Sequence, residues 1–394
     1  MPGVLGGVRV LDFGRYIAGP YCASLLAEHG AEVIRIEKRD GSEDRHQVPL
    51  PGAGVGGLFL QMNRNKRGMT LDPMTEAGRD VVRRLVATAD VVVANLPPQT
   101  LIAMGLDEAS LRAVKPDIIL TTVSAFGEGG PYSERVGFDG VGQAMSGAVY
   151  MTGEPDQPYR ANAAWVDFTT ALHAAFGTMA ALMAKRQSGE GQRVETALFA
   201  NAVTVTNAML IEQAVVQADR IPTGNRGQTA APVDIFKTRD GWVMTHVVGT
   251  PLYKRWARLM GEPEWLTDPR FADDISRGDN SVPISARMAA WCAERDTAAI
   301  VEILAEARIP AGPVLKPQQV LDDPHVQAMG FFQPVDYPGL PKPAPIARAP
   351  VRLSKTPGEI RHRAPLLGEH THAILAELGY DEAAIAELRR LAVI

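Results

Sequence analysis

The residues best suited to chemistry lie in two short segments of the chain. Residues 137–143 read Gly-Phe-Asp-Gly-Val-Gly-Gln, and Asp167 follows about one helix later in Trp-Val-Asp-Phe. Residues 171–184 are almost all Ala, Leu, Met, Phe and Gly, which predicts a buried or tightly packed helix that begins near Asp167. A carboxylate there is partly desolvated yet faces the positive end of the helix dipole, which suits an ionised nucleophile. The alternative is a cap that accepts backbone N–H bonds, the commoner role for Asp at a helix start.

Two groups of cations are candidates for binding phosphate. Residues 63–67 read Asn-Arg-Asn-Lys-Arg, and Arg35, Lys38 and Arg39 close a predicted strand. Such groups could clamp a phosphate or pyrophosphate, or they could be solvated charged turns. Gly14 and the following residues 18–20 do not form a G-x-G-x-x-G motif after the first strand, and the chain has no P-loop or G-x-S-x-G motif, so dinucleotide, ATP and α/β-hydrolase functions are not supported.

Composition limits the partners and the cell compartment. The formal net charge of -5 does not favour nucleic acid or an anionic membrane, and the apolar run 171–184 is too short to span a bilayer. Only Cys22 and Cys292 occur, and residues 1–7 lack a basic stretch before an apolar run, so we expect a cytoplasmic protein without disulfides. The pair of histidines at 370–372 lacks further clustered ligands, so no metal site is predicted.

The spacing of apolar runs predicts an α/β fold. A strand over 8–13, a helix over 18–29 and a strand over 32–37 form a β–α–β unit. Continuous β-branched runs suit parallel strands that are covered on both faces. Further strands are expected over 90–95, 117–123 and 193–197, with helices over 75–87 (capped by Thr75) and 108–114. The fold class is therefore a Rossmann-like large domain with a parallel sheet.

The pattern changes after residue 220. Residues 236–244 read as a hairpin with an Asp-Gly turn, and helices are expected over 251–260, 284–294 and 297–306. Residues 334–357 hold many prolines and predict an extended linker, followed by a helical tail interrupted near Gly379. We predict three parts: 1–220 as the large domain, 221–330 as a smaller α+β domain, and 331–394 as a linker with helices that return to the large domain.

Five motifs in the right order resemble the family III CoA-transferases, and the resemblance covers nearly the whole chain. The matching segments are 8–13 with 18–22, then 30–37, 63–67, 137–140 and 364–371. The resemblance implies that Asp167 is the catalytic carboxylate and that acyl-CoA and a small carboxylic acid are substrates. It implies no permanently bound cofactor, and an interlocked homodimer.

The resemblance also implies the residues that surround the substrates. Coenzyme A would lie over the first β–α turn and the neighbouring strand ends, with Asp139 as a second polar residue near the reaction centre. A glycine loop would cover the site during turnover. The implied substrate- and CoA-binding residues are Tyr16, Ile17, Ala18, Lys38, Arg39, Leu71, Asn95 through Met104, Phe138 and Asp139, and the loop residues are Gly224, Gly227 and Gln228.

Five positions depart from the patterns of the family and its relatives. Ile17 replaces a Gln of formyl-CoA transferase that helps to hold oxalate, and Ala103 replaces an Arg near CoA. Asn225 and Arg226 interrupt the glycine loop. Phe138 stands where racemases of this fold carry His, and Phe cannot act as the second base of a racemase, so transfer is favoured. The alternatives are a 2-methylacyl-CoA racemase and a non-catalytic CoA-binding homologue; the acid pair stays open among dicarboxylic, branched and aromatic acids.

Overall fold

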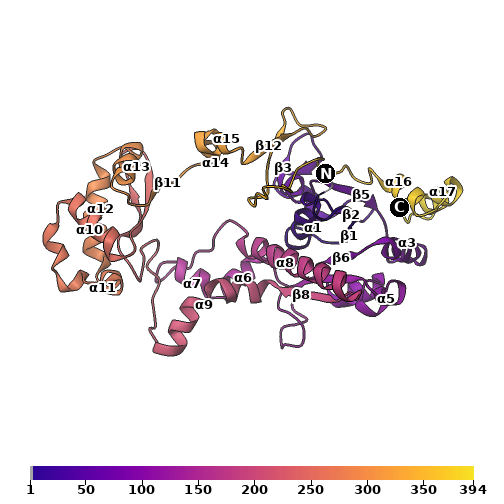
Figure 1. Cartoon of the computed structure of the whole chain (residues 1–394), viewed down its shortest axis with the longest axis horizontal. Helices are drawn as coiled ribbons and strands as arrows, with labels where there is room; N and C mark the ends of the chain where they lie inside the picture. The colour runs from indigo at the N-terminus through magenta and orange to yellow at the C-terminus, as the bar shows by residue number, and fades with distance from the viewer. Residues whose placement is uncertain (1–2) are drawn as a thin grey trace. The chain divides into compact units, whose positions relative to one another are not determined.

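The computed structural model describes residues 3–394, which form two compact units (Figure 1). The first unit contains the chain up to Ser146, Ala161–Leu210 and Ala328–Ile394, and the second contains Gly147–Arg160 and Ile211–Gln327. This division differs from the predicted boundaries mainly at 147–160. That segment is held within the second unit by contacts distant in sequence, such as the bond from the Gly224 N–H to the Gly153 carbonyl (3.0 Å). No change of composition marks it.

A six-stranded parallel sheet forms the centre of the first unit and confirms the predicted α/β class. The strand order is β5-β2-β1-β6-β7-β8, and every neighbouring pair is parallel. The order reverses between β1 and β6, as in doubly wound nucleotide-binding folds. The strands are β1 (Arg9–Asp12), β2 (Glu32–Glu37), β5 (Lys66–Thr70), β6 (Val91–Ala94), β7 (Ile119–Ser124) and β8 (Arg193–Ala197).

Helices cover both faces of this sheet because its strands carry apolar side chains on both sides. Val10 packs in the cluster with helices α1 (Ala18–Glu28) and α8 (Trp165–Ser188). Leu11, one residue later, packs in the opposite cluster. The helices of that second face include α3 (Glu76–Thr88), α5 (Glu108–Val114), α16 (Thr371–Glu377) and α17 (Glu382–Arg390). Thr75 caps α3 by accepting the Gly78 N–H at 3.0 Å, and the tail is broken at Gly379, both as predicted.

Helix α8 packs tightly against α1 but is not buried on all sides, so the prediction is confirmed only for the face toward α1. Its side chains facing α1 are enclosed, but Leu172, Phe176 and Met183 are 49%, 75% and 61% exposed. The following helix, α9 (Leu198–Val216), is apolar and largely uncovered. By length and composition alone α9 could cross a membrane, and only 17% of its most apolar 18-residue stretch is buried.

The second unit is a small α+β body, as the sequence predicts. Strands β9 (Val233–Lys237) and β10 (Trp242–His246) form the expected antiparallel hairpin, and β11 (Ala311–Pro313) pairs with β10. Its core surrounds the fully buried Trp256. The helices are α7 (Ala148–Thr152), α10 (Thr250–Met260), α11 (Asp274–Asp279), α12 (Ser281–Ala293), α13 (Thr297–Glu306) and α14 (Pro317–Asp322).

The proline-rich segment 334–357 is not a plain extended linker, which corrects the prediction. Strand β12 (Phe332–Val335) pairs antiparallel with β13 (Ala344–Ala347), and Pro334 lies opposite Pro345. A two-stranded ribbon tolerates both prolines because each strand has a free edge. The ribbon packs through Ile346 against α2. The other short elements are β3 (Pro49–Leu50), β4 (Val55–Gly56), α2 (Gly57–Met62), α4 (Pro98–Met104), α6 (Asp139–Met145) and α15 (Pro324–Met329).

Candidate active site

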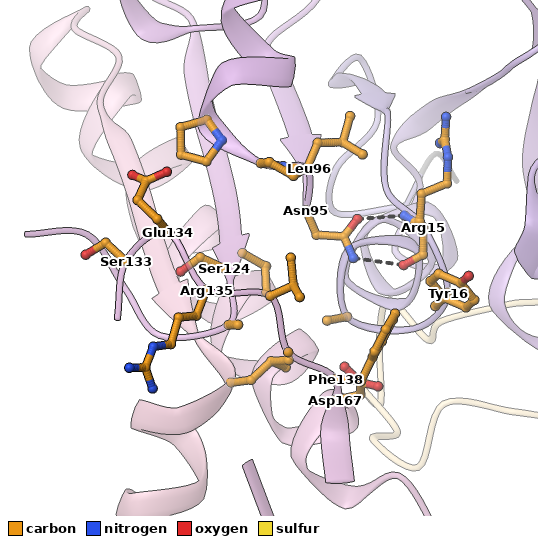
Figure 2. A pocket seen from close by; sticks show the side chains of 18 residues that line it. Arg15, Tyr16, Asn95, Leu96, Ser124, Ser133, Glu134, Arg135, Phe138 and Asp167 are labelled. Carbon is orange, nitrogen blue, oxygen red and sulfur yellow. Dashed lines mark hydrogen bonds between the residues drawn. The ribbon is translucent and has the colours of Figure 1, made fainter. Parts of the chain in front are cut away.

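A cavity of about 300 Å³ opens in the first unit at the carboxyl ends of β1, β6 and β7 (Figure 2). The sheet order reverses between β1 and β6, and ligands of open α/β sheets bind at such a reversal. Asp167 and Phe138 both line this cavity, together with the turn after β1. The lining residues are Arg15, Tyr16, Ala18, Asn95–Pro98, Val123–Ala125, Ser133–Phe138, Asp167 and Leu198.

Asp167 lies in the first turn of α8, but it does not cap the helix. The N-cap residue is Ala164, whose side chain has no oxygen. Asp139 supplies the missing acceptor: its Oδ2 accepts the N–H of Val166 at 2.8 Å and that of Asp167 at 3.1 Å. Within residues 3–394, no hydrogen bond reaches the Asp167 carboxylate. The capping interpretation of Asp167 is therefore wrong, and its carboxylate is free to react.

The surroundings of Asp167 favour its protonated form, whereas the helix dipole alone would favour its ionised form. Burial, and then the negative charge of Asp139, raise the pKa of the Asp167 carboxyl to about 7. Among the described residues, no lysine or arginine forms an ion pair with it. Asp167 is therefore balanced between its neutral and ionised forms near neutral pH, which suits a nucleophile that must react and later leave.

The turn between β1 and α1 is held rigidly beside this carboxylate. Asn95 Oδ1 accepts the Arg15 N–H at 2.6 Å, and Asn95 Nδ2 donates to the Arg15 carbonyl at 2.8 Å (Figure 2). Asp44 Oδ2 accepts the Tyr16 N–H at 3.2 Å. Tyr16 adopts a left-handed conformation with φ of 62°, and its ring meets Phe138 edge-on with centroids 5.5 Å apart. Such strain for a bulky residue is retained only where neighbours enforce it.

The remaining residues of this turn lie at the cavity or beside it. Ala18 lines the cavity, and Ile17, the N-cap residue of α1, is buried in the core beside it. Asn95 also lines the cavity, and both ends of its side-chain amide are bonded to Arg15. In this structure the side chain of Asn95 therefore fixes the backbone of the turn at Arg15.

The cationic segment 63–67 does not form a phosphate clamp. Lys66 is fully buried, with its Nζ 2.7 Å from Asp12 Oδ2, and the buried Arg64 donates to Glu28 at 2.5 Å. Arg35 is likewise buried and lies 2.7 Å from Asp44. These cations neutralise acids inside the fold, so the phosphate interpretation is wrong for them.

The other predicted CoA-binding residues fall into two groups. Lys38 and Arg39 follow β2 at the carboxyl edge of the sheet, and Lys38 is half-exposed and paired with Glu43. Arg39 lines a separate cavity of about 380 Å³ with Arg389. Leu71 and Met104, in contrast, are buried in the core against α3 and the tail helices. Their side chains do not line the Asp167 cavity, and their expected place beside the adenine and pantetheine of CoA stays a prediction.

The predicted glycine loop belongs to the second unit. Gly224 has φ of +63° and is tied to Gly153, and the Gly227 N–H donates to the Val233 carbonyl at 2.6 Å. The Gln228 carbonyl accepts a bond from Arg220 at 3.3 Å. Its closure over Asp167 stays a prediction.

The histidines have structural contacts. His173 Nδ1 bonds to Asn201, His370 Nδ1 accepts the Gly68 N–H at 3.1 Å, and His372 pairs with Glu382. Across the described part of the chain, no three His, Cys, Asp or Glu side chains gather to hold a metal ion.

Sequence reasoning missed the segment 133–136, which forms one wall of the cavity. Arg135 lies over the Tyr132 ring, 4.0 Å from its centroid, and both belong to an irregular stretch after β7. The Gly-Glu-Gly-Gly run at 127–130 marked this stretch as a loop, but nothing local showed which way it folds.

Comparison with known proteins identifies the family of the chain. A sequence model of CoA-transferase family III matches residues 5–371. The chain is 35% identical to succinyl-CoA–D-citramalate CoA-transferase of Chloroflexus aurantiacus, over 100% of this chain and 98% of that protein. It is 33% identical to succinate–glutarate CoA-transferase of Agrobacterium fabrum, over 95% of each. A crystal structure of a CaiB/BaiF family protein from Brucella suis matches with a TM-score of 0.84 and 32% identity, covering 96% of this chain and 100% of that one.

The fold and the family match together define an α/β enzyme of the CoA-transferase class. The chain belongs to CoA-transferase family III. Enzymes of this family act on an acyl-CoA and a carboxylic acid.

Proposed function

We propose that this protein moves coenzyme A from an acyl-CoA to a free carboxylic acid, with Asp167 as the nucleophile. The observation that carries the proposal is the Asp167 carboxylate. It lines a cavity at the sheet reversal, receives no hydrogen bond and forms no ion pair within residues 3–394, and its pKa is raised to about 7. An acid held only for structure would be hydrogen-bonded or ion-paired, as Asp12 is with Lys66.

The reaction follows from the chemistry of a carboxylate and a thioester. Asp167 attacks the thioester carbonyl and expels CoA thiolate, which leaves a mixed anhydride. The thiolate then attacks the Asp167 carbonyl, releases the donor acid as a carboxylate and forms an aspartyl-CoA thioester. The acceptor acid repeats the two steps in reverse and leaves as the new acyl-CoA. The covalent relay retains the thioester bond energy, provided water is excluded.

We propose short dicarboxylic acids as the substrate class, with succinyl-CoA as the donor. The two related CoA-transferases described above carry succinyl-CoA or succinate in their names, together with citramalate or glutarate. The cavity of about 300 Å³ suits an acyl group of this size. Arg135 at its wall is a cation that could meet a distal carboxylate.

The nucleotide end of CoA would extend along the carboxyl edge of the sheet toward β2. Lys38 and Arg39 follow that strand, and Arg39 shares a cavity with Arg389. These side chains, unlike the buried Arg35, are accessible to a phosphate. Asn95 and the two prolines after it would border the pantetheine arm.

We propose that two copies of the chain assemble and that the glycine loop at 224–228 closes over a bound thioester. The apolar side chains of α8 and α9 support the first proposal, because Phe176 and Val215 are 75% and 74% exposed. Exposed apolar surface of this extent is typical of a protein interface. The second proposal rests on the glycines of the loop, which permit a change of backbone conformation.

The rival function is racemisation of a 2-methylacyl-CoA. It needs bases on both faces of the α-carbon. Phe138 occupies the position next to Asp139 on the cavity wall and cannot accept a proton. This observation favours transfer.

Mass spectrometry in D2O separates these functions. The protein is mixed with succinyl-CoA or a 2-methylacyl-CoA and a pool of free acids, including glutarate and citramalate. New acyl-CoA species are the expected result and identify the acceptor. Deuterium at the α-carbon without a new acyl-CoA would instead establish racemisation, and no change with any donor would remove the proposal.

A further inference from the structure

Asp139 is a buried carboxylate with an unusual set of partners. It is the first residue of α6 and is 8% exposed. Its Oδ2 accepts two backbone N–H groups of α8, and its Oδ1 accepts a bond from Gln143. In the described chain no lysine or arginine pairs with it. Its contacts are therefore all to groups that fix the backbone around Asp167.

Helix α8 needs an acceptor at this point. The first N–H groups of a helix have no partner within the helix, and Ala164 cannot supply one. Asp139 takes this role from a neighbouring helix, and it does so at Asp167 itself, whose N–H lies 3.1 Å from Oδ2. A change at Asp139 would therefore move the backbone that carries the reacting carboxylate.

Gln143 extends this support to the segment that leads into α8. Its Nε2 donates to the carbonyls of Ala161 and Ala163 at 3.3 Å, and its Oε1 accepts the Ala161 N–H at 3.0 Å. Gln143 is one turn after Asp139 on α6. The two side chains together tie α6 to the start of α8.

The charge of Asp139 acts on Asp167 as well. Like charges held near each other disfavour ionisation, and Asp139 is a cause of the raised pKa of Asp167, second to burial. The other charged or titratable residues of the cavity wall are Arg15, Tyr16, Glu134 and Arg135. Arg15 directs its guanidinium to the carbonyls of residues 13, 14 and 36 and so does not offset the negative pair directly.

We propose that Asp139 is a positioning residue for Asp167: it fixes the first turn of α8 and holds a second negative charge beside the reacting carboxylate. The proposal rests on the proposed role of Asp167 as nucleophile. It replaces the implied role of Asp139 as a substrate contact, since all its observed bonds are within the protein.

The test follows the protonation of Asp167 directly, so it does not depend on turnover. Protein labelled with ¹³C at aspartate carboxyls is titrated by NMR, and the Asp167 signal is identified by its loss in Asp167→Asn. Asp139→Asn keeps an oxygen for the α8 N–H groups but removes the charge. We expect the Asp167 titration to move to lower pH by on the order of one unit.

A matched control is Asp107→Asn. Asp107 caps α5 by accepting the Ser110 N–H at 3.1 Å and does not line the cavity, so this variant should leave the Asp167 titration unchanged. Asp139→Ala removes both acceptor and charge, and we expect kcat to fall about 10²-fold through misplacement of the carboxylate. Asp139→Asn should lose much less.

The outcomes are distinct. An unchanged Asp167 titration in Asp139→Asn would overturn the charge role, and wild-type kcat in Asp139→Ala would overturn the positioning role. A wild-type protein that titrates near pH 7 but transfers no CoA would leave the inference about Asp139 standing and remove the proposed function.

Discussion

Two aspartates of the first unit lie in opposite environments. Asp12, at the end of β1, is fully buried, accepts the Gly14 N–H at 2.8 Å and contacts Lys66 and Arg35. Burial alone would raise its pKa, but these two cations lower the pKa of Asp12 below its usual value. Asp167 has burial and another carboxylate beside it, so its pKa rises to about 7.

The difference between Asp12 and Asp167 shows which feature distinguishes the candidate active site from the framework of the fold. Cations are abundant around Asp12, yet all of them neutralise internal acids and none is free for a phosphate. At Asp167 the fold leaves a carboxylate without compensation, which costs stability. A buried charge that is paired is part of the framework, and one that is left unpaired on a cavity wall is a candidate for chemistry.

The largest expected effect comes from Asp167→Asn. The amide has nearly the same shape but cannot attack a thioester, so transfer should fall by about 10³-fold or more. The measurement is the rate of new acyl-CoA formation, with CoA binding measured separately by calorimetry. CoA binding should survive, and a variant that keeps near-wild-type transfer would contradict the role of Asp167.

Substitution of Lys66 should act on stability instead. Lys66→Met leaves the buried Asp12 without its nearest cation, and we expect the free energy of unfolding to fall by about 3–5 kcal/mol. Urea denaturation followed by circular dichroism measures it. The control is Lys185→Met, which breaks more exposed pairs with Asp90 and Asp117 and should cost only about 1 kcal/mol. Equal losses for the two variants would show that burial of the pair has no special weight.

The pH dependence of stability should separate the two aspartates. For Asp167 the pKa is about 7 in the folded state and 3.8 as the model-compound value, so the folded protein binds more protons between these limits. The free energy of unfolding therefore falls as pH rises through this window, and Asp167→Asn removes that slope. The variant should gain on the order of 1–3 kcal/mol over wild type between pH 5 and pH 8.

The contribution of Asp12 to stability depends on pH in the opposite direction. Its pKa is lowered in the folded state, so its contribution to stability is present above 3.8 and is lost as pH falls below that value. If the free energy of unfolding depended on pH in the same way in wild type and Asp167→Asn, this result would contradict the raised pKa of Asp167.

The smallest expected effect is on substrate binding at the cavity wall. Phe138→Leu removes the edge-on contact with the Tyr16 ring but keeps an apolar side chain. We expect KM for acyl-CoA to rise about threefold, since an aromatic pair contributes about 0.5–1.5 kcal/mol, while kcat stays close to wild type. Steady-state kinetics measures both. A fall in kcat of the size expected for Asp167→Asn would place Phe138 in the chemistry itself.

The sequence by itself determined those features that depend on neighbouring residues. The β-branched runs specify the parallel strands, and Thr75 caps α3 because its partner is only three residues away. The place of Asp167 at the start of α8 follows from the apolar run behind it. The family resemblance also came from sequence alone, because its motifs keep their order along the chain.

Only the tertiary structure decided how distant side chains compensate one another. Lys66 and Asp12 are 54 positions apart, and their contact depends on the order of strands in the sheet. Asp139 and Asp167 are 28 positions apart, and their contact depends on the packing of α6 against α8. A local pattern reveals that a residue is charged, but whether that charge is buried, paired or free is a property of its neighbours in space. The cations of 63–67 were therefore misjudged, and the cap of α8 was found only in the folded chain.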